Sequence, residues 1–347
     1  MRVSIVVNNH NYAAFVGRAI DSALEQTHAD TEVLVVDDGS TDGSRAVIAG
    51  YNGRVRTLLK PNGGQGSAYN AGFAAATGEV VFFLDADDWL YPQAAARAAA
   101  AFAGVGAGAV AGEGAGNTVS KVQFQLDIVD GEGRPQGRRL PREMHDDTAL
   151  ALLGRFAAYG TPPGSGNAYS AALLRQLLPM EEPPWRTAAD SVPILLAPAH
   201  GRVVSLREPL GAYRVHKKAT PDGLLFNNEP KGLWPEYDRI RRCKDLVVKH
   251  FSAIGRPLAL PPLLAPWEAR VLALCLRFGP PGQPREPVPR LAGMGLALRS
   301  VWSWPGMRPL MRVAQSGWML CVWLLPQALA RRIGRVDRAL KGGARGR

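Results

Sequence analysis

An apolar run at residues 80–84 leads directly into three carboxylates, Asp85, Asp87 and Asp88, and this junction constrains the chain more than any other segment. Like charges packed this closely are unfavourable unless a cation or a polyvalent ligand compensates them. Hard oxygen ligands suit Mg²⁺ or Mn²⁺. The junction therefore predicts a divalent-metal site at the end of a buried strand. The alternative is a solvated acidic turn that caps the next helix.

Strand-like apolar runs alternate with helical patterns before residue 90. The strand-like runs are residues 3–7, 32–36, 55–59 and 79–84, and the helical patterns include residues 14–26 and 66–76. This alternation predicts an α/β fold with a doubly wound, mostly parallel sheet flanked by helices. Polar clusters follow three of the runs, at residues 8–12, 37–40 and 85–88. Because ligands bind beyond the carboxyl ends of such strands, the three clusters indicate one site.

Four segments in a fixed order carry a resemblance to a known family. They read S-I-V-V-N-N-H-N-Y, then E-V-L-V-V-D-D-G-S-T-D-G-S, then G-G-Q-G-S-A-Y-N-A-G, then F-L-D-A-D-D. The set resembles glycosyltransferase family 2, inverting enzymes with the GT-A fold, and the resemblance covers residues 1–216. It implies a nucleoside diphosphate (NDP) sugar as donor, with a UDP-sugar as the first expectation, a glycan or lipid-linked acceptor, and Mg²⁺ or Mn²⁺ as cofactor.

The resemblance also suggests which side chains hold the nucleotide. It places Asn9, His10 and Asp38 on the base and ribose, with Asp37 as a less specific neighbour. A carboxylate can accept a hydrogen bond from the N3–H of uracil. The alternative for Asp37 and Asp38 is a turn or a helix cap before residues 44–49, which the sequence D-G-S-T-D-G-S would also support.

Further residues are assigned to the diphosphate and its metal by the same resemblance. Asp87 is the expected metal ligand, Asp85 is expected on the ribose or a metal-bound water, and Asp88 is a possible third partner. His216, in L-G-A-Y-R-V-H, resembles the family histidine that approaches the metal or diphosphate. Arg214 is placed to bind phosphate with its planar guanidinium group.

The expected catalytic residue is Asp190, in P-P-W-R-T-A-A-D. The resemblance makes it the general base that removes the acceptor hydroxyl's proton, and one carboxylate suffices for a single displacement with inversion. The family usually has an acidic residue one position earlier, where this chain has Ala189. Two alternatives stay open: Asp190 as the N-cap of a helix over residues 191–199, and a catalytically silent sugar-nucleotide-binding or scaffold protein.

Other function classes are disfavoured by motifs that the sequence lacks. A nucleotidyltransferase should carry a Gly- and Arg-rich loop with a lysine after the first strand, and residues 8–12 have none. A dehydrogenase needs G-x-G-x-x-G there, whereas G-G-Q-G lies at residues 63–66. No Q-x-x-R-W motif of processive synthases is present, which favours addition of a single sugar. The basic residues are not interleaved with stacking aromatics, which argues against nucleic acid.

The length of 347 residues allows one catalytic domain and an appendage. We predict a catalytic domain at residues 1–225, with a nucleotide-binding half at 1–103 and an acceptor half at 117–225. Residues 226–347 are predicted to form a helical C-terminal extension. Because the first strand begins at residue 3 and the three cysteines are scattered, we expect a cytoplasmic catalytic domain.

The formal charge of +11 is concentrated near the C-terminus, where residues 331–347 hold seven basic residues and one acidic residue. Before this tail, residues 313–330 are uncharged and include two tryptophans. Apolar side chains beside a basic tail are typical of a segment that lies on an anionic membrane surface, and we predict this for residues 301–347. An amphipathic helix packed on the protein and a spanning helix are the alternatives.

Overall fold

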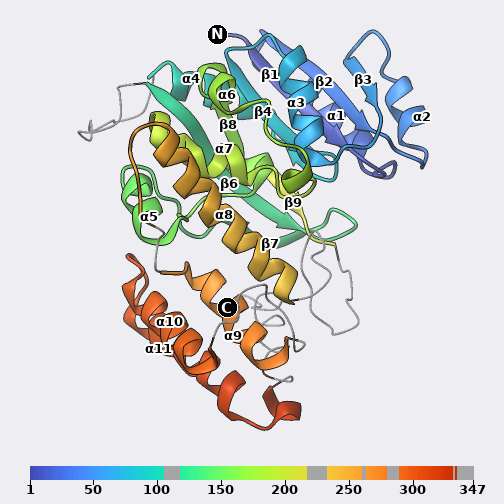
Figure 1. The fold of residues 1–347 in the computed structure, drawn as a ribbon. Helices are drawn as coiled ribbons and strands as arrows, with labels where there is room; N and C mark the ends of the chain where they lie inside the picture. The colour runs from blue at the N-terminus through green and yellow to red at the C-terminus, as the bar shows by residue number, and fades with distance from the viewer. Residues whose placement is uncertain (105–117, 217–232, 260–262, 280–288, 331–332, 334–347) are drawn as a thin grey trace. The chain divides into compact units, whose positions relative to one another are not determined.

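The computed structural model describes residues 1–104, 118–216, 233–259, 263–279, 289–330 and 333 (Figure 1). The chain forms two compact units: the first comprises residues 1–150 and 160–216, and the second comprises residues 151–159 and 217–347. The end of the predicted catalytic domain at 217–225 and nearly all of the basic tail lie outside the described residues. Each unit is treated by itself below.

The first unit is built on one sheet of nine strands in the order β3-β2-β1-β4-β8-β6-β9-β5, with β7 paired to β6. Neighbours among β1 to β4 are parallel, and so are β6 and β9, while the other pairs are antiparallel. The strands are β1 Val3–Asn9, β2 Thr31–Asp38, β3 Arg56–Lys60, β4 Val80–Asp85, β5 Trp89–Leu90, β6 Val119–Val129, β7 Pro135–Leu140, β8 Asn167–Ser170 and β9 Arg202–Arg214.

Helices cover both faces of this sheet, which confirms the predicted α/β class (Figure 1). The alternation of side chains along β1 shows how. Ile5 and Val7 belong to the core that includes α1 and α4, whereas Val6 faces α3, where Gly72 lets the helix approach closely. The helices are α1 Val16–Leu24, α2 Ser44–Ala49, α3 Gln65–Ala75, α4 Ala94–Phe102, α6 Ala171–Leu177 and α7 Ser191–His200, with short 3₁₀ turns η1 Gly164–Gly166 and η2 Pro183–Trp185. Helix α5, Ala149–Phe156, runs from the first unit into the second.

The strand register brings the polar clusters of the sequence to one edge of the sheet. Asn9 at the end of β1 is level with Asp37 of β2, and Asn8 is level with Asp85 of β4. Strand β1 lies between β2 and β4 in the sheet. The chain therefore adds β2 and β3 on one side of β1 and then crosses to the other side of β1 to add β4. This switch point is where open α/β sheets bind ligands.

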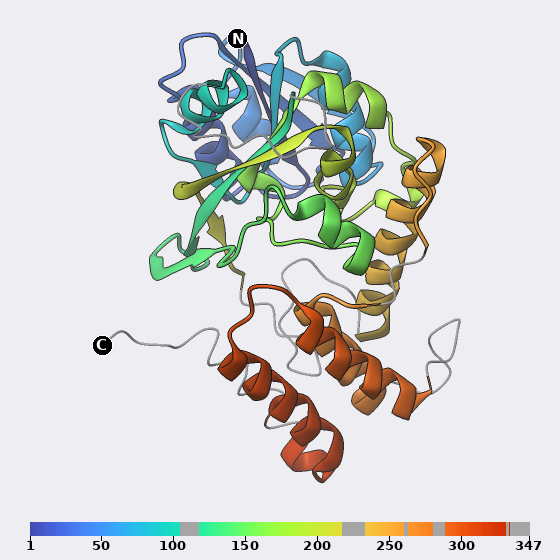
Figure 2. The ribbon, with the colours of Figure 1, turned by 90° about the vertical axis from the view of Figure 1, so that its left-hand side faces the viewer.

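The second unit is helical, as predicted for the C-terminal extension (Figure 2). Its helices are α8 Leu233–Ala253, α9 Pro266–Phe278, α10 Arg290–Ser303 and α11 Pro309–Leu324. They share an apolar core to which Leu272, Val301 and Met319 each contribute a fully buried side chain. Of the helices in the described residues, none is long and apolar enough to cross a membrane.

Candidate active site at the carboxyl ends of the strands

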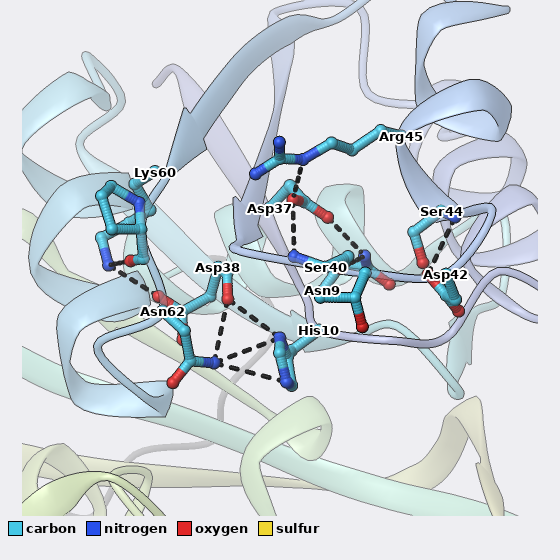
Figure 3. Close-up of polar contacts among 12 residues, drawn as sticks. Asn9, His10, Asp37, Asp38, Ser40, Asp42, Ser44, Arg45, Lys60 and Asn62 are labelled. Atoms are coloured by element: carbon cyan, nitrogen blue, oxygen red, sulfur yellow. Dashed lines mark hydrogen bonds and ion pairs between the residues drawn. The ribbon is translucent and has the colours of Figure 1, made fainter.

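The ends of β1 and β2 form a closed polar cluster (Figure 3). The Asn9 amide donates to Asp37 Oδ2 at 2.9 Å and lies 3.1 Å from Ser40 Oγ. Asp37 Oδ1 accepts from the Ser40 backbone N–H at 3.0 Å and from Arg45 Nε at 2.9 Å. Burial alone would raise the pKa of Asp37, but these hydrogen bonds outweigh it and lower the pKa. Asp37 is therefore an ionised carboxylate that fixes the turn after β2, as the turn alternative anticipated.

Both oxygens of Asp38 are engaged by the chain itself. Lys60 Nζ lies 2.6 Å from Oδ1, and the backbone N–H groups of Gly63 and Gly64 donate to Oδ1 and Oδ2 at 2.9 and 2.7 Å. The carboxylate thus anchors the loop before α3 against the end of β2. Gly39 makes this possible, because its φ is +74° and a Cβ there would lie 2.5 Å from the Asn62 nitrogen. Direct contact of Asp38 with a nucleotide stays a prediction.

His10 projects beside this loop. Its Nδ1 lies 2.9 Å from the carbonyl oxygen of Asp38 and 3.2 Å from the Asn62 amide nitrogen. The amide nitrogens of Asn11 and Asn62 lie 3.3 Å from Nε2. The exposed ring lies beside Asp38 and Asn62 (Figure 3), and the resemblance assigns it to the base.

Of the three carboxylates after β4, Asp88 is buried and Asp85 and Asp87 are half-buried, which argues against a fully solvated acidic turn. Asp88 is only 2% exposed, and its Oδ2 has no hydrogen-bond partner among the described residues. Asp85 accepts from the Asn8 amide at 2.6 Å and from the Gln65 amide at 3.3 Å. Burial, followed by the charges of Asp87 and Asp190, raises the pKa of Asp85 to about 7. Burial and the charges of Asp87 and Asp85 raise the pKa of Asp88 well above its ordinary value.

His216 follows the end of β9 and meets the middle carboxylate of this group. Its Nε2 lies 2.8 Å from Asp87 Oδ2. The ring is held edge-on against Phe15 at 5.3 Å between centroids, with Tyr12 at 6.0 Å. The two predicted metal ligands are therefore adjacent although 129 positions separate them in the sequence.

Arg214 has a different environment from the one predicted. Its Nε donates to the carbonyl oxygen of Asp87 at 2.9 Å, and its Nη1 donates to that of Gly131 at 2.7 Å. Its backbone N–H donates to Asp88 Oδ1 at 2.9 Å. The buried guanidinium group thus ties β9 to the acidic turn, and a contact with phosphate stays a prediction.

A divalent cation fits this group of side chains. An uncompensated Asp88 oxygen and two carboxyl groups with raised pKa values show that the acidic turn lacks positive charge, which a cation would supply. Within the described residues, however, no three His, Cys, Asp or Glu side chains form a metal-binding group. The protein would therefore contribute the pair Asp87 and His216, and phosphate oxygens or water would complete the coordination.

Asp190 immediately precedes α7, but its side chain makes no capping hydrogen bond to that helix. Instead, its Oδ2 accepts from the backbone N–H of Gly164 at 3.1 Å. The structure thus does not support the N-cap alternative, although the positive end of the helix dipole still favours the ionised form of the carboxylate.

Gln65, which the sequence showed only as part of G-G-Q-G, links the acidic turn to the segment of Asp190. Its Oε1 accepts from the Ala189 N–H at 2.9 Å, and its Nε2 donates to Asp85 Oδ1. Ala189 is fully buried. Its backbone, rather than a second acid, therefore connects this segment to the rest of the site.

Comparison with known proteins agrees with this arrangement. Residues 4–160 match the family described as Glycosyl transferase family 2. An uncharacterized glycosyltransferase of Nostoc sp. is 39% identical over 222 residues, which is 62% of this chain and 65% of that protein. The chondroitin synthase of Pasteurella multocida is 47% identical over 95 residues, which is 26% of this chain and 10% of the synthase.

The chain also resembles solved structures in its fold. The crystal structure of S. aureus TarS residues 1–349 has a TM-score of 0.51 and 18% identity, with 100% of this chain and 93% of that chain covered. The same protein in complex with UDP-GlcNAc gives a TM-score of 0.51. These similarities confirm the GT-A fold that the resemblance predicted. The matches span less than two thirds of the Nostoc protein and of the synthase.

Proposed function

We propose that this chain transfers a sugar from an NDP-sugar to a hydroxyl group of a glycan or lipid-linked acceptor, with inversion at the anomeric carbon. The observation that carries the proposal is the placement of Asp190. Its carboxylate is held by the Gly164 N–H instead of capping α7, and it lies in the same electrostatic environment as Asp85. A base is thereby available close to the acidic turn that receives the diphosphate.

The donor is proposed to be a UDP-sugar held along the edge of the sheet. The cluster around Asn9, His10 and Asp38 receives the uridine, and Asp85 binds the ribose or a water molecule on the metal. That TarS, with the same fold, was crystallised with UDP-GlcNAc supports a uridine nucleotide. Asp87 and His216 would hold Mg²⁺ or Mn²⁺, which would supply positive charge to offset the charge that develops on the departing diphosphate.

The chemical step needs one proton transfer by the protein. Asp190 takes the proton of the acceptor hydroxyl as its oxygen forms a bond to the anomeric carbon. The bond from that carbon to the diphosphate breaks, and the diphosphate leaves with the electron pair. Arg214 and Gln65 hold the acidic turn in place during the reaction, because each donates a hydrogen bond to it.

The proposal is tested by incubating the purified chain with a panel of UDP-sugars and Mn²⁺ and measuring UDP release. We expect hydrolysis of at least one donor, since water can replace the acceptor. Tight UDP-sugar binding without release would favour the silent-protein alternative. Formation of UDP-sugar from UTP and a sugar phosphate would favour a nucleotidyltransferase.

We further propose that the helical unit rests on an anionic membrane surface, at the cytoplasmic face of the plasma membrane, and α11 is the basis for this. Its polar side chains point inward: Gln315 donates to the Pro266 carbonyl oxygen and Arg312 to that of Trp304. Its outward face is apolar. Leu310 is 79% exposed and Leu324 is 69% exposed. A helix at a water-exposed surface normally has the opposite distribution, with its polar side chains outward and its apolar side chains buried.

The exposed apolar positions of α11 form one stripe, because they recur every three or four residues. We define the α11 stripe as Leu310, Val313, Gly317, Cys321 and Leu324, all exposed. Residues 290–330 contain four arginines and no acidic residue. The segment thus combines an apolar stripe with charged side chains that are all positive, and this combination suits a lipid surface with anionic headgroups.

Replacing both Leu310 and Leu324 with Ser is expected to weaken sedimentation of the full chain with vesicles of anionic phospholipid by tenfold or more. The reason is the loss of two leucine side chains from the lipid, each worth about 1.5–3 kcal/mol when fully buried. Leu59→Ser is the matched control, because Leu59 is 57% exposed but lies on the sheet unit. Equal sedimentation of the stripe variant and the Leu59→Ser control would contradict the proposal. If the parent and the control have twice the monomer mass in solution and only the stripe variant is monomeric, the partner of the α11 stripe is a second copy of the chain.

A further inference from the structure

Lys121 is a lysine in an unusual place. It lies near the start of β6, in the interior of the sheet between β8 and β9, and its exposed fraction is 0%. Its Nζ donates to Thr161 Oγ1 at 2.7 Å. An ammonium group in the protein interior costs several kcal/mol of solvation, so a fully buried lysine that serves only packing would be replaced without loss by an apolar side chain.

The partner of this ammonium group leads directly to the proposed base. Thr161 begins the segment that ends in η1, and Gly164 of the same segment donates its N–H to Asp190 Oδ2. The Asn167 amide donates to the carbonyl oxygen of Pro163 at 2.8 Å, which fixes the segment from the other side. Lys121 and Asp190 are therefore attached, by one hydrogen bond each, to positions three residues apart on a short, clamped stretch.

The charges around Asp190 explain what Lys121 contributes. Tyr69 of α3, fully buried and stacked on Phe83 at 3.9 Å, is neutral, and Asp85 of β4 is acidic. The charge of Asp85 disfavours a second negative charge nearby, and the neutral Tyr69 provides no positive charge to offset it. Lys121 of β6 supplies positive charge in its protonated form, which the charge of Asp190 favours. Burial lowers the pKa of Lys121 well below its ordinary value, and the charge of Asp190 acts in the opposite direction.

We propose that Lys121 is a positioning residue for the transfer reaction: its buried ammonium group, held by Thr161, keeps Asp190 ionised beside Asp85 and Tyr69. This inference rests on the proposed function, since it presupposes that Asp190 acts as the base. It also gives a reason why the chain tolerates Ala189, where the family usually has an acid. A second carboxylate beside Asp190 would compete with it for the positive charge of Lys121.

The test is the pH dependence of UDP release by Lys121→Met, with saturating Mn²⁺ and the UDP-sugar that the parent hydrolyses fastest. Loss of an opposite charge within about 4–6 Å raises the pKa of a carboxyl group by about 1–3 units, and loss of a more distant charge raises it by less. The acidic limb of the kcat/KM profile should therefore move to higher pH by about one unit. Lys121→Arg, which keeps the charge, should leave the limb closer to its parent position.

Two controls separate this role from a structural one. Lys244→Met removes another buried lysine, whose Nζ donates to the carbonyl oxygen of Leu263 in the helical unit, and it should not move the acidic limb. In an Asp190→Asn background, Lys121→Met should change the residual rate less than twofold, because the group on which it acts is gone. A purely structural lysine would lower the rate by the same factor in both backgrounds.

The outcomes distinguish this inference from the function that it presupposes. An Asp190→Asn variant with full activity would overturn both. An inactive Asp190→Asn variant together with an unmoved acidic limb in Lys121→Met would overturn only the role of Lys121. Should Lys121→Met fail to fold, Thr161→Val removes the hydroxyl that stabilises the ammonium group while it retains the lysine. Its acidic limb should move in the same direction by a smaller amount, and an unmoved limb would again refute the role.

Discussion

Replacing Asp87 with Asn is expected to abolish the metal-dependent part of UDP binding and with it nearly all turnover. An amide is a neutral and weaker ligand for Mg²⁺ or Mn²⁺, and Asp87 is the carboxylate that His216 joins at 2.8 Å. Without the cation, charge on the leaving diphosphate is not neutralised. Titration calorimetry of UDP with and without Mn²⁺ measures the effect directly, and the parent should show a large difference between the two titrations.

The fold should survive this substitution. Asp87 lies between two carboxyl groups whose pKa values are raised in part by its charge, so its removal relieves repulsion with Asp85 and Asp88. The temperature of unfolding near neutral pH should therefore equal or exceed that of the parent. If Asp87→Asn binds UDP with the same Mn²⁺ dependence as the parent, Asp87 is not the ligand that holds the metal.

The sequence predicted the sheet well because strand and helix signals are local. The periodicity of residues 14–26 and the apolar run at 79–84 are visible without knowledge of distant contacts, and they correspond to α1 and β4. The boundaries were less certain where polar residues continue a strand. The first strand was predicted to end at Val7, yet Asn8 and Asn9 extend it because they pair with β2.

The candidate site shows the same division between local and distant information. Asp87 and His216 were both named from the resemblance, but their contact depends on β9 returning to pair with β5, which no local pattern reveals. No motif in the sequence distinguishes Lys121 from other lysines. Its complete burial follows from the position of β6 between β8 and β9, and strand order is set by long-range pairing.

The assignment of Arg214 illustrates a further limit. Its residue type and its place before His216 suggest phosphate binding, and a guanidinium group suits that role. In the folded chain the same donors meet the carbonyl oxygens of Asp87 and Gly131. A sequence indicates which groups a side chain can bind, but the competing partners within the protein become visible only once the loops are placed.

Asp190→Asn is expected to reduce UDP release by a factor of about 10²–10⁴, the usual contribution of a positioned general base. Binding of UDP with Mn²⁺ should be nearly unchanged, because the carboxylate faces the Gly164 N–H rather than the residues assigned to the nucleotide. The amide oxygen of asparagine can still accept that hydrogen bond, and no cap of α7 is lost. Stability should therefore stay close to that of the parent.

A loss of rate with intact binding is what separates a base from a structural carboxylate. Glu208→Gln is a suitable control, because Glu208 is an exposed carboxylate of β9 paired with Arg97, and its change should leave the rate unaltered. Unfolding of Asp190→Asn, measured by circular dichroism, or a rate within threefold of the parent would each assign Asp190 a structural role. In either case the proposed inversion mechanism would lack its proton acceptor, and the proposal that Lys121 acts through it would fail as well.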